Sequence, residues 1–289
     1  MNILRKILIS TGLIATVLSL LFSSEAKGSG TSALQANTAQ TNKRKITVEK
    51  PDLEKIRKRT LDPEDAMYFP KLMAKYNRND TIMTSEEYRN FYLGYMFQED
   101  YDPYRTSPYS GYTDDLREKA THSKEEIDTI RKYAELALRD NPFDLRQMSF
   151  LVHVLKEKRK DMSAKIWEYR LEHLLGAIKS TGTGEDADNA WYVIYPMHEY
   201  DMVQLLGYEA TDAKFFDPGV DYLTVTPDPD AARKPGPKDI KEGFYFNVVV
   251  PQQQYELKHP EGAEIEETEV EETEVEEEYP DPDDVPAEP

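Results

Sequence analysis

The segment "MHEYD" places three residues that can do chemistry close together, namely His198, Glu199 and Asp201. An imidazole beside two carboxylates suits metal binding or acid/base catalysis. If the segment is helical, His198 and Asp201 are three positions apart and share a face, whereas Glu199 is turned by about 100°. The second histidine of an HExxH zinc motif is missing. The alternative interpretation, polar side chains that satisfy the end of a strand, therefore stays open.

A second polar segment, "EDYDPY", contains four further candidates: Asp100, Tyr101, Asp102 and Tyr104. The Asp-Pro pair favours a turn and the acids favour solvent. We therefore predict that Tyr101 and Tyr104 lie on an exposed rim, where tyrosine rings bind a glycan or a peptide. Together with Glu99 the acids also suit calcium, but the rest of a calcium-loop pattern is missing.

Other reaction centres find little support in the sequence. The chain has no cysteine, which excludes disulfides, thiolate nucleophiles and cysteine-ligated zinc. No serine occupies a G-x-S-x-G elbow, so an α/β-hydrolase is not indicated. We predict no catalytic residue and no cofactor, and we leave open whether the protein is an enzyme.

Two capping boxes mark the helices that must position these segments. Thr84 and Glu87 begin a helix predicted over 85–97, and Ser123 and Glu126 begin another over 124–140. At 100° per residue the first helix has an apolar stripe predicted to be core, whereas Arg89, Asn90 and Leu93 point elsewhere. The stripe consists of Tyr88, Phe91, Tyr92, Tyr95 and Met96.

The later part of the chain changes from a helical to an extended pattern. Helices over 124–140, 144–160 and 163–179 suggest tetratricopeptide-like helix pairs, although one and a half repeats are too few to establish a solenoid. From Ala190 on, the segments "AWYVIYP", "DYLTVTP" and "GFYFNVVVP" predict a small antiparallel sheet of three or four strands, with a short helix in "EYDMVQLLG". The sequence therefore predicts an α+β fold, with an N-terminal helical bundle and a C-terminal sheet.

Both ends of the chain differ from this body. Residues 1–26 have a basic start, a short apolar run and a Ser-x-Ala site, which predicts a signal peptide cleaved after Ala26. An uncleaved anchor is the alternative, although the run falls short of the ~20 residues that span a bilayer. Residues 27–45 read as a disordered tether and 260–289 as a disordered acidic tail, leaving one domain over 46–259.

The distribution of charge argues against nucleic acid as a partner. The net charge is −19, but residues 261–289 carry fifteen acids and no base, so the rest of the chain has 40 acids against 36 bases. A protein that binds nucleic acid needs a basic face. The tail is predicted to be a solubilising spacer, with a weak cation sink as the alternative.

The block "YFPKLMAKYNRNDTIMTSEEYRNFYLGYMFQEDYDPY" resembles the opening of a family of mostly Bacteroides proteins catalogued as domain of unknown function 4919. The pieces "AWYVIYPMHEYD", "LLGYE", "DYLTV" and "GFYFNV" follow in the same order, so the resemblance covers roughly Pro51 to Val250. It implies a bacterial exported protein and no activity that can be transferred. The acidic tail is an addition to the family pattern.

These observations together favour binding over catalysis. We predict a periplasmic or secreted module that binds a peptide or glycan, with an unknown protein or glycan partner in the cell envelope and no stable membrane span after cleavage. One alternative is an envelope hydrolase that uses carboxylates such as Asp100, Asp102 or Glu199. Another is a structural component of the envelope.

Overall fold

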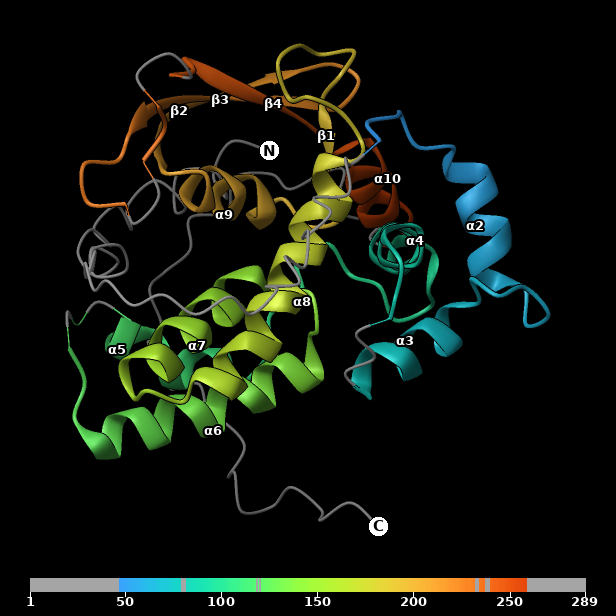
Figure 1. The fold of residues 1–289 in the computed structure, drawn as a ribbon. Coiled ribbons are helices and arrows are strands. Elements are labelled where there is room, and N and C mark those ends of the chain that lie inside the picture. Colours follow the sequence, from blue (N-terminus) through green and yellow to red (C-terminus); the bar gives the residue numbers. More distant parts are fainter. Residues whose placement is uncertain are drawn as a thin grey trace, which may run out of the picture.

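The computed structural model describes residues 47–78, 82–117, 119, 121–231, 234–236 and 240–258. In this part of the chain a series of helices precedes a four-stranded sheet (Figure 1). This order confirms the predicted α+β fold. The predicted signal peptide, tether and acidic tail lie outside the described residues. Within the described ranges, no helix is both long enough and apolar enough to cross a membrane.

The first helices are α2 (Leu53–Leu61), α3 (Phe69–Asn77) and α4 (Ser85–Gly94), which continues as a short 3-10 helix over Tyr95–Phe97. The predicted capping box is present, because the Glu87 amide donates to Thr84 Oγ1 over 3.1 Å and the Thr84 amide donates to Glu87 Oε2 over 2.7 Å. The apolar stripe of α4 is buried as predicted.

Two residues of α4 were predicted to point away from the core, and that prediction is wrong. Leu93 is fully buried and Asn90 is 4% exposed. The physical reason is that α4 packs against α2, α3 and α8 at once, so more than one of its faces is covered. A single helical stripe underestimates the burial of a helix that has neighbours on several sides.

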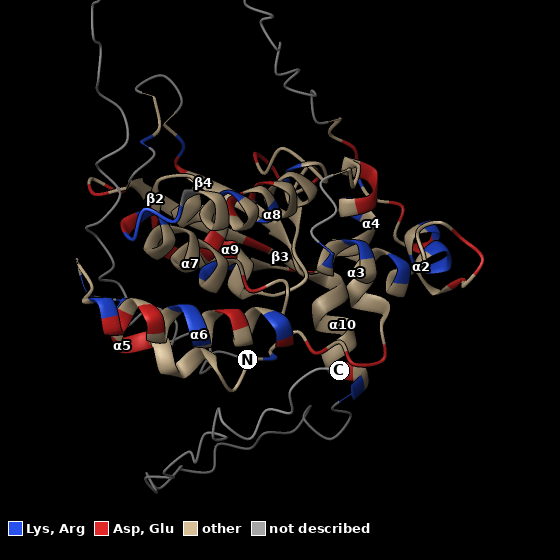
Figure 2. Ribbon diagram, turned by 60° about the horizontal axis from the view of Figure 1, so that its bottom comes forward, with Lys and Arg blue, Asp and Glu red and all other residues tan. Residues whose placement is uncertain are grey.

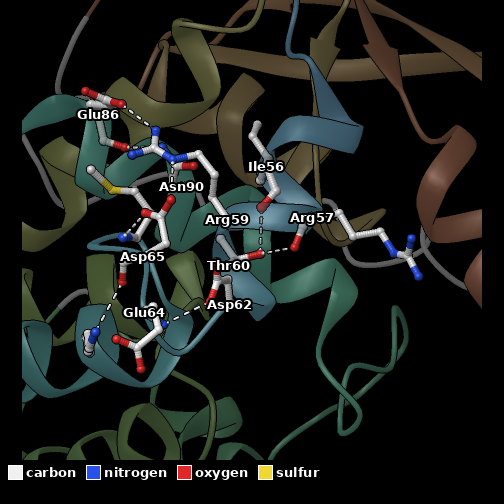
Figure 3. A network of polar contacts seen from close by, with 11 residues as sticks. Ile56, Arg57, Arg59, Thr60, Asp62, Glu64, Asp65, Glu86 and Asn90 are labelled. Atoms are coloured by element: carbon white, nitrogen blue, oxygen red, sulfur yellow. Dashed lines mark hydrogen bonds and ion pairs between the residues drawn. The ribbon is translucent and has the colours of Figure 1, made fainter.

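Figure 3 shows a polar network that links α2 to α4. The Arg59 guanidinium donates to Asp65 Oδ2 over 3.2 Å and to Glu86 Oε1, on α4, over 2.8 Å. Beside it, Thr60 lies so close to Gly94 that a Cβ at Gly94 would be 2.4 Å from the Thr60 methyl group. The network therefore stabilises the close packing of α2 on α4. Both carboxylate partners of Arg59 belong to this network.

The middle of the chain forms α5 (Asp114–Arg117), α6 (Lys124–Asp140), α7 (Leu145–Glu157) and α8 (Asp161–Lys179). Helix α6 packs on α7 and α7 packs on α8, so the predicted helix pairs are present. Lysine and arginine alternate with aspartate and glutamate along α6 (Figure 2).

The sheet consists of β1 (Trp191–Tyr192), β2 (Tyr208–Phe216), β3 (Val220–Pro227) and β4 (Gly243–Asn247), in the order β1-β4-β3-β2. The pairs β2–β3 and β3–β4 are antiparallel as predicted, but β1 pairs with β4 in parallel. The sheet is therefore mixed, because the chain returns after β3 and inserts β4 between β3 and β1. The prediction of a purely antiparallel sheet is wrong at this pair.

Two helices complete the described chain, α9 (Met197–Leu205) and α10 (Val249–Lys258). The short helix predicted after the first strand is thus confirmed as α9. The segment "VVVP" was predicted as the end of a strand, but α10 begins within it, at Val249. Helix α9 lies against the inner face of the sheet, and the helices in Figure 1 all lie on that side. The opposite face is called the outer face below.

Candidate functional site

His198, the first sequence candidate, is a buried member of a hydrogen-bond chain. The Ile194 amide donates to the Tyr92 hydroxyl over 3.2 Å, and that hydroxyl lies 2.7 Å from His198 Nδ1. His198 Nε2 lies 2.9 Å from the Phe143 carbonyl oxygen, which can only accept, so Nε2 carries the proton and Nδ1 accepts from Tyr92. Burial lowers the pKa of His198 to about 3. The ring is therefore neutral, and both nitrogens are occupied.

Asp201 uses a different partner. Arg146 Nε donates to Asp201 Oδ1 over 3.0 Å, and the Asp201 side chain is 3% exposed. Burial raises the pKa of Asp201 to about 6, although Arg146 opposes the shift. Glu199 is also buried. Among the described residues, no group of three or more histidine, aspartate or glutamate side chains is placed to hold a metal ion.

Tyr101, the first residue of the predicted rim, is fully buried, so the prediction that it is exposed is wrong. Its hydroxyl donates to the Ile194 carbonyl oxygen over 2.5 Å, and its ring stacks on Tyr195 with centroids 6.2 Å apart. The reason lies far along the chain, where Lys258 Nζ donates to the carbonyl oxygens of Glu99 and Tyr101. This contact with α10 holds the turn in the position that directs the ring inward.

Tyr104, in contrast, is 53% exposed and meets Tyr255 of α10 edge to face, with centroids 5.0 Å apart. Asp102 Oδ1 accepts from the Tyr104 amide over 2.9 Å, as an Asx turn requires. Asp100 lies 3.7 Å from Arg105. The four candidate residues in "EDYDPY" therefore divide between the core and the surface.

The acids of the two sequence segments bind different arginines. Asp100 lies beside Arg105, which also binds Asp140, whereas Asp201 is bound by Arg146. An envelope hydrolase of the glycosidase type that used both segments would need two of their carboxylates in one shared pocket, about 5–10 Å apart. The arrangement of these charges favours structural roles for them.

The outer face of the sheet carries a pair of tyrosines that the sequence analysis did not single out. Tyr222 of β3 is directly opposite Tyr245 of β4, and their ring centroids are 4.6 Å apart at an interplanar angle of 43°. Lys214 of β2 is opposite Tyr222 on the other side. Both tyrosines are half-buried, whereas their neighbours Leu223, Phe244 and Phe246 are buried on the inner face. We call Lys214, Tyr222 and Tyr245 the outer row.

Tyr222 leans along the sheet and does not stand perpendicular to it. A Cβ at Gly243 would lie 2.3 Å from the Tyr222 Cζ and hydroxyl oxygen, so the outer end of the ring covers the Gly243 backbone. Burial raises the pKa of Tyr222, and Tyr245 and Glu242 act in the same direction. A tyrosine that covers a glycine is a known way to protect a sheet. In this position it also directs one side of its ring away from the sheet.

The row next to the outer row is polar. Thr224 lies opposite Asp212 on one side and Gly243 on the other. Phe216, at the end of β2, is 46% exposed. The outer face therefore combines aromatic rings with hydroxyl, ammonium and carboxylate groups. Alternation in "DYLTVTP" and "GFYFNV" was the signal for this face, but the register that aligns the two tyrosines was not visible in it.

The family model described as "Domain of unknown function (DUF4919)" matches residues 54–257. The chain belongs to this family. The match extends over the helices from α2 and over all strands of the described sheet. No curated protein and no solved structure matches the chain. The description of the DUF4919 family names no activity, so the geometry has to indicate the function.

Proposed function

We propose that this DUF4919 protein is a non-catalytic binding module that holds a glycan on the outer face of its sheet. The observation that carries the proposal is the contact between Tyr222 and Tyr245 in register on adjacent strands. A tyrosine ring offers rigid contact area to the C–H groups of a sugar, and its hydroxyl can bond to the sugar's oxygens. The strands fix both rings with little loss of conformational entropy on binding.

The neighbouring side chains suit a sugar ring. Lys214 donates hydrogen bonds, Asp212 accepts them, and Thr224 does both. All three belong to the face that carries the tyrosines. A peptide that bound here would have to lie across side chains, because the main-chain groups of β3 are already paired to both neighbouring strands. This favours a glycan over a peptide strand added to the sheet.

The charges around the outer row favour a neutral glycan. Lys214 is accompanied by Asp212 and Glu209 on β2 and by Glu242 beside Tyr222. A sulfated or carboxylated sugar would meet these carboxylates at short range, where like charges repel. We therefore expect neutral oligosaccharides to bind better than anionic ones.

The test is a glycan and peptide array followed by calorimetry with the best neutral oligosaccharide. Tyr222→Ala and Tyr245→Ala should each weaken binding by at least about tenfold, as expected for aromatic anchors at the centre of a contact. Gly243→Ala should weaken it too without removing a ring, because the new methyl group would displace Tyr222. Tyr104→Ala is the matched control, since it removes an exposed tyrosine elsewhere.

Three results would overturn the assignment. Retained binding in both sheet variants would remove the site from the outer face. Loss of binding only in Tyr104→Ala would return it to the "EDYDPY" turn. Binding to peptides but to no glycan would replace the ligand class.

The proposal includes export to the periplasm or the cell exterior, supported by the basic start, short apolar run and Ser-x-Ala site of residues 1–26. Mass spectrometry of the protein isolated from its cells should find Lys27 at the N-terminus. An intact Met1 in the membrane fraction would contradict cleavage.

A further inference from the structure

A second buried histidine, His122, lies in the connection between α5 and α6, immediately before Ser123 at the N-cap of α6. Its side chain is 0% exposed, while its backbone is partly accessible. Both ring nitrogens have partners. Nδ1 lies 2.9 Å from Glu157 Oε2, and Nε2 lies 2.8 Å from the Leu116 carbonyl oxygen.

Both of these partners accept hydrogen bonds. A backbone carbonyl never donates, and an ionised carboxylate has no proton to give. Burial acts to raise the pKa of Glu157, but hydrogen bonds from the His122 side chain and amide outweigh it and hold that pKa below its ordinary value. The other Glu157 oxygen, Oε1, accepts from the His122 amide over 3.0 Å. A neutral imidazole has one N–H and can satisfy only one of the two acceptors.

We propose that His122 and Glu157 form a proton-dependent latch, in which a doubly protonated His122 ring joins Leu116 and Glu157 and releases one of them when it loses a proton. The latch joins Leu116 of α5 and His122 to Glu157 at the C-terminal end of α7. Raising the pH should therefore loosen the contact of His122 with these partners and the start of α6.

The charged and titratable groups around the ring support this direction. On α7, burial lowers the pKa of His153, and a charge on His153 would act on Glu157 in the same direction as His122 does. Glu126 on α6 interacts favourably with His122 and binds Lys119. Phe150 packs against the ring edge to face, with centroids 5.8 Å apart. Two further charged groups of the described residues lie beside these neighbours: Arg117 lies over the Phe150 ring, and Lys156 lowers the pKa of His153.

The protonation state can be measured directly on the full chain. Long-range ¹H–¹⁵N spectra of ¹⁵N-histidine-labelled protein distinguish a ring with two N–H groups from either neutral tautomer. At about pH 5.5 His122 should show two N–H groups, because both ring nitrogens face acceptors, whereas His198 should show one, at Nε2. At about pH 8.5 the hydrogen-exchange protection factor of the His122 amide should be about tenfold lower than at about pH 5.5, because a charge-assisted hydrogen bond is lost. The protection factor already corrects for the intrinsic effect of pH on exchange.

Two variants keep the proposal falsifiable. In Glu157→Gln the amide group can donate to a neutral Nδ1, so the fold should persist and the pH dependence should disappear. His173→Gln is the control, since His173 Nδ1 faces a single carbonyl, that of Tyr169, at 2.7 Å. A His122 ring that stays a single neutral tautomer at about pH 5.5 would overturn the latch. So would an unchanged pH dependence in Glu157→Gln.

Discussion

The tyrosines of the core and those of the outer row differ in what holds their hydroxyl groups. Inside, Tyr92 bonds to His198, and Tyr101 donates to the Ile194 backbone. On the outer face, Tyr222 and Tyr245 are positioned by strand register and by contact with each other. Each of these two core tyrosines is thus buried at its ring and hydrogen-bonded at its hydroxyl group. Each tyrosine of the outer row, in contrast, has one side of its ring accessible to a ligand. Residue type alone does not separate the two groups, but their partners do.

The largest effect is expected for a substitution of a core tyrosine. Tyr101→Ala should lower the free energy of unfolding by about 4 kcal/mol, because it removes a fully buried ring. Tyr104→Ala, three positions away, should lower it by less than about 1 kcal/mol, because that ring is exposed. Urea denaturation of both variants measures the difference. Equal losses would mean that the turn behaves as one unit and that the contrast in burial has no energetic meaning.

A smaller change asks whether the hydroxyl groups matter as much as the rings. Tyr92→Phe should cost about 3 kcal/mol, because it leaves His198 Nδ1 and the Ile194 amide buried without their partner. Tyr222→Phe on the outer face should cost less than about 0.5 kcal/mol. If both variants are equally stable, the hydrogen-bond chain contributes nothing to the fold.

The third test uses pH to probe Asp201, one of the buried acids of α9. The folded-state pKa of Asp201 is raised from 3.8 to about 6, so the fold favours its protonated form. Stability from this group is present at low pH and falls as the pH rises from about 4 to about 6, by roughly 2 kcal/mol. Asp201→Asn should lack this fall, and the difference between the two stability-against-pH curves isolates it. Parallel curves would show that Asp201 titrates as it does in the unfolded chain.

The smallest expected effect lies on the outer face. Tyr222→Ala should lower the free energy of unfolding by about 1 kcal/mol or less, the scale of one cross-strand pair. The same variant should weaken glycan binding by at least about tenfold. A loss of several kcal/mol in stability would instead identify Tyr222 as a structural residue and weaken the argument for a binding face.

Local signals in the sequence predicted the helices well. The capping boxes at Thr84 and Ser123 are present, because both partners of a capping box lie within one turn of chain. The position of Tyr101 was not predictable, since Lys258 on a distant helix holds its turn. The partners of His198 are equally remote, on α4 and just before α7. Contacts between distant segments decide burial here, and periodicity carries no information about them.

The parallel pair β1–β4 has a consequence for how the protein folds. The strands of the β2–β3 hairpin are close together along the chain. Trp191 of β1, in contrast, pairs with Phe246 of β4, and the whole hairpin lies between them in the sequence. Because closing a long loop costs entropy before any contact rewards it, we expect the hairpin to form early and β1 to join last. Conservative substitutions in β1 should then accelerate unfolding and leave the refolding rate nearly unchanged, while those in β3 should slow refolding. Stopped-flow measurements of the refolding and unfolding rates of variants in both strands would test this order of assembly.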